Sequence, residues 1–440
     1  MNLDLILFRH GKAESGNAAT EDLKRALTEE GKEELRKSMT HFRAFMKPNQ
    51  EIHLWSSPLL RAVQTAEIIS EEFGIAEILQ FEFIGNGDYF DLNSELGLLK
   101  QPATVIIVGH DPYLSEWSKN IFGYQIPFKK GAAASFALRS LSPLAGDLEC
   151  LISSEVPRPD PKKPLKEEYQ KILTHCLSEV LKMKNLFLLR PEDPETAHQF
   201  RVKIRQIRSL ISFIKPLLNQ EDYGKVQDDL RNLANRFGYL REIDVLEEEW
   251  NTLIESRSDT FSDSTAFLSA LKKERSNQQS QLQAQFGNSA SSSVFNNLWV
   301  RLIEFPWEND SKKQILYAEF ITARFKKWLS KARKELKKME ANDPKAIHSL
   351  RIRLKKLRYA LTILEPALNK NNNRLVLNLK KLQDKLGIIC DAQRDRIILK
   401  DLRLKYRKTS FHYESGVLEG YLISRAEQIT KEIEKFGLDK

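Results

Sequence analysis

Residues 198–208 read HQFRVKIRQIR, and residues 348–358, 150 positions further along, read HSLRIRLKKLR. On a helix, side chains three and four residues apart lie on one face, so each copy predicts a helix with an apolar stripe and a cationic stripe. The apolar stripes must face a core, so this repeat predicts a helical core in the larger part of the chain. The cationic stripes are His198, Arg201, Arg205 and Arg208 in the first copy, and His348, Arg351, Lys355 and Arg358 in the second.

These stripes differ from an ordinary solvated face, which mixes Glu with Lys because like charges destabilise a helix. Neither copy holds an acid between its His and its last Arg. A bound polyanion would offset the repulsion, and Arg and Lys both bind phosphate oxygens well. We therefore predict one polyanion site lined by both stripes. Flanking candidates are Lys203, Arg353 and Lys356, with Arg236, Arg241 and Lys381 on neighbouring helices.

The repeat is longer than the stripes. FRVKIRQIRSLISFIKPLL aligns with LRIRLKKLRYALTILEPAL without a gap, and each copy is followed by a Leu-rich segment that runs into a Gly. Hydrophobic periodicity after residue 165 is helical nearly throughout. The second domain, residues 166–440, is therefore predicted to be all-α, with two pseudo-symmetric helical bundles.

The first 155 residues follow another pattern. DLILF (4–8), EIHLWSS (51–57), TVIIVGH (104–110) and ASFALRS (134–140) read as strands that alternate with amphipathic helical segments. Alternating strands and helices predict an α/β domain with a mostly parallel sheet. Residues 156–165 are rich in proline and predict a linker.

Charge also divides the chain. Residues 1–160 hold 23 acidic and 16 basic residues, whereas the rest carries a net charge of +16. Three dispersed cysteines, Cys150, Cys176 and Cys390, without a CxxC pair argue against a disulfide scaffold or a structural metal, and no cofactor is predicted. No apolar run is long enough for a membrane span. We expect a cytoplasmic protein whose basic part binds a polyanion.

The first domain carries Arg9-His10-Gly11 after its first strand, SSPLLRAVQT at 56–65, and a strand that ends in Gly109-His110. A transferring phosphoryl group needs several cations in a fixed cage. Arg9, Arg61 and a protonated His110 would supply them. A neutral His10 would offer a nucleophilic nitrogen that takes the phosphoryl group and passes it to water.

These three motifs, in this order, resemble the histidine phosphatase superfamily, and the short domain is most similar to its SixA-like phosphohistidine phosphatase branch. The resemblance implies a phosphoglycerate-mutase-like three-layer sandwich, with His10 as the phosphorylated residue. It also implies that Arg9, Arg61 and His110 form the phosphate pocket, and that Gly11 and Ser57 shape it. The general acid stays open, with Glu82 and Asp88 in FEFIGNGD as the nearest candidates.

The stripes resemble the CHAD domain, the conserved-histidine α-helical domain, whose helix reads roughly HxxRVxxRxxR. The resemblance spans about residues 163–440 and implies a basic channel that binds inorganic polyphosphate. Two departures are Gln206, at a commonly basic position, and Glu242, where the family often has Asp.

The sequence thus predicts a phosphatase tethered to a polyphosphate-binding module. We expect it to act on a phosphorylated protein or small molecule and to associate with polyphosphate granules. Two alternatives are a non-catalytic polyphosphate-binding scaffold and a phosphatase for which polyphosphate itself is the substrate. Nucleic acid is disfavoured, because single-strand binders interleave aromatic residues with their cations and the stripes hold none. The oligomeric state stays open.

Overall fold

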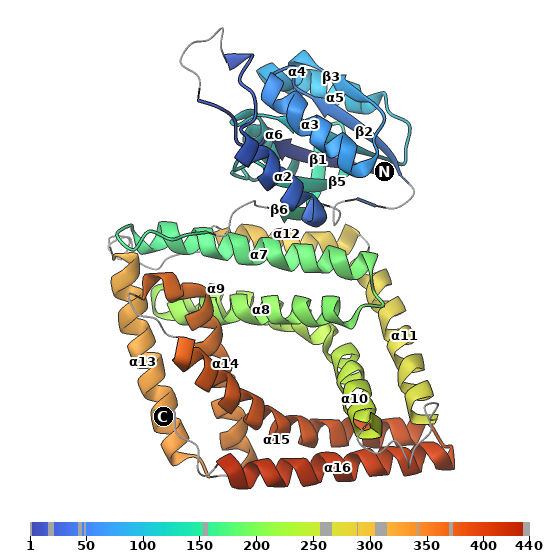
Figure 1. Ribbon diagram of the computed structural model, residues 1–440, viewed down its shortest axis with the longest axis vertical. Coiled ribbons are helices and arrows are strands. Elements are labelled where there is room, and N and C mark those ends of the chain that lie inside the picture. Colours follow the sequence, from blue (N-terminus) through green and yellow to red (C-terminus); the bar gives the residue numbers. More distant parts are fainter. Residues whose placement is uncertain are drawn as a thin grey trace. The chain divides into compact units, whose positions relative to one another are not determined.

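The computed structural model describes residues 2–15, 22–42, 46–47, 50–152, 157–255, 266–287, 289–303, 315–340, 343–368 and 373–433 (Figure 1). The chain forms two compact units. The first unit comprises Met1–Pro157, Thr174–Pro191 and Gln285–Glu304, and the second comprises Arg158–Leu173, Glu192–Ala284 and Phe305–Lys440. No helix among the described residues is both long and apolar enough to cross a membrane.

A six-stranded sheet in the order β3-β2-β4-β1-β5-β6 forms the centre of the first unit. β1 pairs in parallel with β4, β2 in parallel with β4 and β3, and β5 antiparallel with β1 and β6. The four predicted strands are confirmed, whereas β3 and β6 were not predicted. The strands are β1 (Leu3–Arg9), β2 (Glu51–Ser56), β3 (Ile78–Gln80), β4 (Ala103–Gly109), β5 (Ala133–Leu141) and β6 (Leu144–Ile152).

Helices cover this sheet, as the α/β prediction requires. Ile6 and Phe8 of β1 pack against α2 and α3 in one apolar core, and α6 contacts β1 and β6. β1 and β4 are buried along nearly their whole length, which is typical of central parallel strands. The helices are α2 (Glu29–Phe42), α3 (Leu60–Phe73), α4 (Glu82–Asn86), α5 (Tyr89–Gly97) and α6 (Tyr113–Phe122).

The first unit also takes in helical segments from beyond residue 165. α12 (Ser289–Ile303) packs against β6, and Lys184 of α7 (Leu165–Leu189) donates a 2.8 Å hydrogen bond to Glu149 of β6. The compact units therefore do not follow a single cut in the sequence.

The second unit is helical among its described residues. Its two stripe helices begin alike: Asp193 and Asp343 cap them by accepting backbone N–H groups, and a proline follows each cap. Both helices also end in a 3-10 turn. The helices are α8 (Pro194–Ile214), α9 (Gln220–Arg236), α10 (Gly238–Glu255), α11 (Ala266–Phe286), α13 (Tyr317–Lys338), α14 (Pro344–Leu364), α15 (Asn373–Lys405) and α16 (Thr409–Ile433).

Candidate functional site

Three parallel strands deliver the predicted phosphatase residues to one edge of the sheet. β1 ends at Arg9 and β4 at Gly109, and these two residues are register partners. His10 and His110 follow directly, and their ring centroids lie 5.0 Å apart. Ser57 follows β2, and its Oγ lies 2.8 Å from Nε2 of His110. The carboxyl edge of a parallel sheet is where α/β folds hold ligands.

The tautomer of His10 follows from its hydrogen bonds. Nδ1 lies 2.7 Å from the carbonyl oxygen of Gly11. A carbonyl can only accept, so Nδ1 carries the proton and Nε2 carries the lone pair. Arg61 Nε lies 3.3 Å from this Nε2 and donates to it. The Nε2 lone pair of His10 thus faces the Arg61 guanidinium, a group that binds phosphoryl oxygens well.

Both histidines are buried, and burial favours their neutral forms. Burial lowers the pKa of His10 to about 4, assisted by the charges of Arg61 and Arg9. Burial also lowers the pKa of His110 to about 3, together with the nearby His10 and Arg61. The predicted protonation of His110 therefore requires the negative charge of a bound phosphate. A bound phosphate would favour the imidazolium, since an opposite charge nearby stabilises the charged form.

Arg61 has a partner that the motifs did not reveal. Its Nη1 donates to the carbonyl oxygen of Asp22 at 2.7 Å, and its Nη2 donates to the carboxylate at 3.0 Å. Desolvation opposes ionisation of Asp22, but the Arg61 hydrogen bond and charge outweigh it and lower the pKa of this carboxyl. Asp22 lies 39 residues before Arg61 and outside any periodic pattern, so no sequence signal pointed to it.

Arg9 is held by polar contacts, and Gly11 by close packing. Arg9 Nη1 donates to the Phe128 carbonyl at 2.5 Å and lies 3.7 Å from the Asp111 carboxylate. Gly11 accepts no larger residue without movement, because a Cβ there would lie 2.6 Å from Leu35. The glycine therefore lets the His10 loop approach α2.

The two general-acid candidates differ in their surroundings. Asp88 is the N-cap of α5, and its Oδ1 accepts the backbone N–H groups of Phe90 at 2.9 Å and Asp91 at 3.2 Å. Glu82 is exposed in the first turn of α4. Asp88 thus has a structural task that accounts for its presence without catalysis.

In the second unit, the two cationic stripes meet, because α8 packs against α14. Charges from both helices affect Lys355: burial, together with the charges of Arg351 and Arg205, lowers its pKa to about 7. Burial and the charge of Arg205 lower the pKa of Arg201 to about 10. Four predicted residues, 150 positions apart in sequence, therefore form one group, which we call the basic cluster: Arg201, Arg205, Arg351 and Lys355.

The basic cluster is only partly neutralised. Arg351 donates two hydrogen bonds to Asp391, at 2.9 and 2.7 Å. Within the ranges that the structure describes, Arg201, Arg205 and Lys355 have no carboxylate at ion-pair distance, and Arg201 donates instead to the Phe237 carbonyl. Buried cations are normally paired, so the cluster has the charge pattern of an anion-binding site.

A second group lies next along the stripes. Burial lowers the pKa of Lys356, and Arg208 and Arg353 add to this effect. Arg208 donates to Gln227, and Arg358 donates to Gln383. These four cations also come from both helices, so the line of cations extends beyond the basic cluster.

The two stripe histidines and Lys203 differ in how far they are buried. His198 is half-buried, and desolvation and the charge of Arg241 lower its pKa. His348 is exposed, whereas Lys203 is half-buried. The structure does not bring His348 into the basic cluster.

Arg394 was missed in the sequence. Its charge lowers the pKa of Arg201, Arg205 and Lys355. It also forms an ion pair with Glu242 at 3.3 Å. The segment that contains it, IICDAQRD, reads as acidic, which hid its contribution. Gly387 explains how Arg351 reaches this region, since a Cβ on Gly387 would lie 3.3 Å from Arg351 Nη2.

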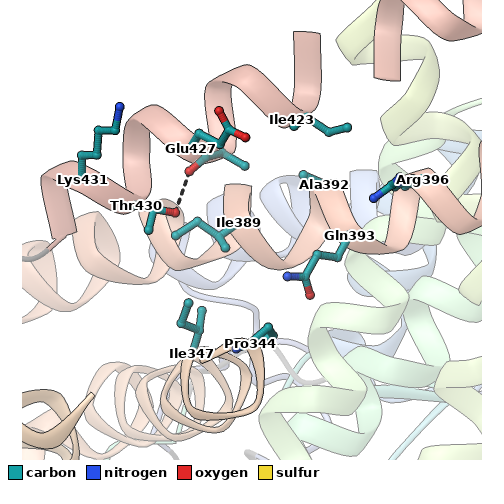
Figure 2. Close-up of a pocket in the computed structure, with 11 residues that line it drawn as sticks. Pro344, Ile347, Ile389, Ala392, Gln393, Arg396, Ile423, Glu427, Thr430 and Lys431 are labelled. Atoms are coloured by element: carbon teal, nitrogen blue, oxygen red, sulfur yellow. Dashed lines mark hydrogen bonds between the residues drawn. The ribbon is translucent and has the colours of Figure 1, made fainter. Parts of the chain in front are cut away.

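A separate pocket of about 570 Å³ lies among α14, α15 and α16 (Figure 2). Ile347, Ile389 and Ala392 give it apolar walls, while Arg396 and Lys431 are exposed. It contains none of the predicted site residues. Among the described residues, no group of three or more His, Cys, Asp or Glu is placed to hold a metal ion.

Several solved structures resemble the chain. The CHAD domain from the plant Ricinus communis has 19% identity and a TM-score of 0.52, covering 63% of this chain and 94% of that chain. The protein histidine phosphatase SixA complexed with tungstate has 24% identity and a TM-score of 0.31, covering 34% and 97%. The putative phosphohistidine phosphatase SixA from Agrobacterium tumefaciens has 19% identity and a TM-score of 0.29, covering 34% and 97%. No curated protein matches the sequence.

Two family models match the chain, one over the predicted phosphatase residues and one over the two stripes. Residues 5–84 match the histidine phosphatase superfamily (branch 1) and include His10 and Arg61. Residues 171–400, more than half of the chain, match the CHAD domain and include both stripes. The phosphatase-type domain implies a phosphorylated substrate. The chain belongs to the CHAD domain family and carries a histidine phosphatase superfamily domain before its CHAD domain.

Proposed function

We propose that this protein is a phosphatase that works through a phosphohistidine at His10 and is tethered to inorganic polyphosphate by the basic cluster. The observation that carries the tether is the convergence of Arg201, Arg205, Arg351 and Lys355 from two helices. Among the described residues, Asp391 is the carboxylate at ion-pair distance from this cluster. Polyphosphate suits such a site because it offers phosphate oxygens and charge without bases.

The reaction follows from the state of His10. Its Nε2 lone pair attacks phosphorus, and the bond from phosphorus to the leaving oxygen or nitrogen breaks. The Nδ1–H group stays hydrogen-bonded to the carbonyl oxygen of Gly11. This hydrogen bond stabilises the positive charge that the ring gains when it is phosphorylated. Water then attacks phosphorus, the P–N bond breaks, and inorganic phosphate leaves neutral His10 behind. Arg9, Arg61 and a His110 protonated by the bound anion hold the phosphoryl oxygens.

The phosphatase half is tested by rapid quench of the full chain with an aryl phosphate. An acid-labile phosphoryl group should appear on the protein and be absent from His10→Ala. His53→Ala is the matched control, since His53 lies on β2 and is half-buried. An active His10→Ala variant would refute the phosphohistidine.

The polyphosphate half is tested by binding of long-chain polyphosphate to the full chain and to Arg205→Gln/Lys355→Gln. Lys272→Gln/Lys273→Gln, which removes two exposed charges of α11, is the control. We expect a loss of about ten-fold or more in the cluster variant alone, since buried charge contacts contribute most. Equal binding by all three proteins would refute the cluster as the site.

The two alternatives are outcomes of these assays. Release of phosphate from polyphosphate that depends on His10 would make polyphosphate the substrate rather than the anchor. Binding without any aryl phosphatase activity would leave a scaffold. We favour the anchor, because the phosphatase part of the sequence is acidic and repels a long polyanion. The protein would then gather where polyphosphate accumulates in the cytoplasm.

A further inference from the structure

Helix α13 carries a basic surface that the stripes do not include. It holds eight basic and two acidic residues. Lys327, Lys331, Lys334 and Lys338 recur at i, i+4, i+7 and i+11, so they form one line along the helix. All four are exposed, and none has an ion-pair partner within the part of the chain that the structure describes. The line extends about 17 Å along the helix axis. We call it the α13 lysine face.

The fold does not require this face. α7 precedes α8 in the chain as α13 precedes α14, yet α7 holds four basic and three acidic residues. Lys171 of α7 pairs with Glu167 and Glu168. A line of like charges three and four residues apart destabilises a helix. The excess of lysine on α13 is therefore a local cost that a bound polyanion would remove.

The chemistry of the face selects among polyanions. Trp328, the aromatic residue in the middle of α13, is half-buried and packs edge-on against Phe213 at 4.9 Å. It is therefore not presented for stacking on bases, which single-strand nucleic-acid sites use. The exposed residues of α13 include no large apolar side chain to insert into a membrane surface. A linear polyanion without bases fits best.

The lysine face adjoins the stripes. Arg353 of α14 is hydrogen-bonded to Glu335 of α13, and α13 packs against α14. Figure 1 shows α13 flanking α14 within the helical unit. The charge of Arg353 lowers the pKa of Lys356, and so does the charge of Arg208 of α8. Positive charge thus lies on both sides of the Arg353–Glu335 ion pair, on the stripes and on α13.

We propose that the α13 lysine face is a second polyphosphate-binding surface, which engages long chains whose other end occupies the basic cluster. This rests on the proposed polyphosphate binding and adds a prediction of its own. A chain too short to leave the cluster gains nothing from α13, whereas a long chain binds more tightly by using both surfaces at once. The protein then discriminates polyphosphate by length.

The test compares the full chain with K327Q/K331Q/K334Q/K338Q, using tripolyphosphate and long-chain polyphosphate across a range of salt. The control, K37Q/K100Q/K119Q/K273Q, removes the same charge from scattered exposed lysines. We expect the α13 variant to keep its tripolyphosphate affinity and to lose about ten-fold or more for the long chain. Its salt slope for the long chain should fall by about 2 to 3, as for four contacts to a flexible strand.

Equal long-chain affinity of the α13 variant and the wild type would overturn the second surface while leaving the cluster in place. Equal losses in the α13 variant and the scattered control would reduce the effect to net charge and overturn it as well. Failure of the wild type to bind either chain would instead refute the polyphosphate function itself. Single-stranded RNA of equal charge should compete weakly, and equal competition would overturn polyphosphate as the ligand of the face.

Discussion

His10 and His110 lie buried together beside Arg9 and Arg61. Burial and these two charges lower the pKa of both imidazoles. In NMR spectra of the ligand-free chain, we expect the imidazole of His10 to titrate near pH 4 and that of His110 near pH 3. Saturating inorganic phosphate should raise the pKa of His110, because a bound anion stabilises the imidazolium. Substitution of each histidine by Gln assigns the signals. Titration of both near pH 6.5 without phosphate would contradict the burial of this pair.

The same shifts have a consequence for stability. In the unfolded chain both histidines take up a proton near pH 6.5, whereas the folded chain resists protonation until about pH 4 and 3. The unfolded state therefore binds more protons in this window, and the free energy of unfolding falls as pH drops below about 6.5. The loss should shrink in His10→Gln, which removes one of the two groups.

Lys355 predicts a pH dependence of polyphosphate binding. Its pKa of about 7 leaves it partly neutral at physiological pH, and a bound polyanion would raise that pKa. Binding should therefore take up a proton, and affinity should fall as pH rises from 7 to 9. Lys355→Arg keeps its charge over this range, so its affinity should stay level when measured by fluorescence anisotropy. A fall of equal size in both proteins would locate the titrating group elsewhere.

For helix α5, substitutions of its N-cap Asp88 can distinguish a role in capping from a role in catalysis. Asn is as good an N-cap as Asp, so Asp88→Asn should keep both the melting temperature and aryl phosphatase activity. Asp88→Ala removes the acceptor for Phe90 and Asp91 and should cost about 1 kcal/mol of stability. Circular dichroism melts and initial rates on one protein batch measure both. A large loss of activity in Asp88→Asn, with its melting temperature kept, would make Asp88 the general acid.

Elements were predictable where their signal is local. The apolar strands 4–8 and 104–110 and both stripe helices follow from period and capping residues that lie within each segment. β6 was missed because it contains Asp147 and Glu149. Their partners, Asn296 at 2.6 Å and Lys184 at 2.8 Å, come from α12 and α7. An acid that is paired by a distant segment looks, in sequence, like a turn or a surface loop.

The site shows the same limit. His10, Arg61 and His110 were predictable, because each lies in a short motif at the end of a strand or the start of a helix. Asp22 and Arg394 were not, since each acts through a partner far along the chain. The protonation of His110 was also beyond the sequence, because it depends on how many cations share one buried space.

For the whole molecule, the first unit depends on residues from outside the first 157. Lys184 is fully buried and pairs with Glu149, whose side chain is 14% exposed. Replacing Lys184 by Met in the full chain leaves this carboxylate largely buried without its cation, which costs about 3 kcal/mol. We expect the temperature at which aryl phosphatase activity is lost to fall clearly. Lys182→Met, on the same helix, is the matched control, since Lys182 only approaches Glu179 at 3.9 Å.

The same dependence predicts the fate of an excised phosphatase domain. A fragment of residues 1–157 lacks α12, which packs on β6, and lacks Asn296 and Lys184, the partners of Asp147 and Glu149. The surface of β6 that α12 covers is then exposed. Exposed apolar surface next to a strand favours aggregation. We expect the fragment to be less soluble and to melt lower than the first unit does within the full chain, measured by differential scanning calorimetry. A fragment as stable as the full chain would show that the helices merely rest on the sheet, and the Lys184→Met effect should then vanish too.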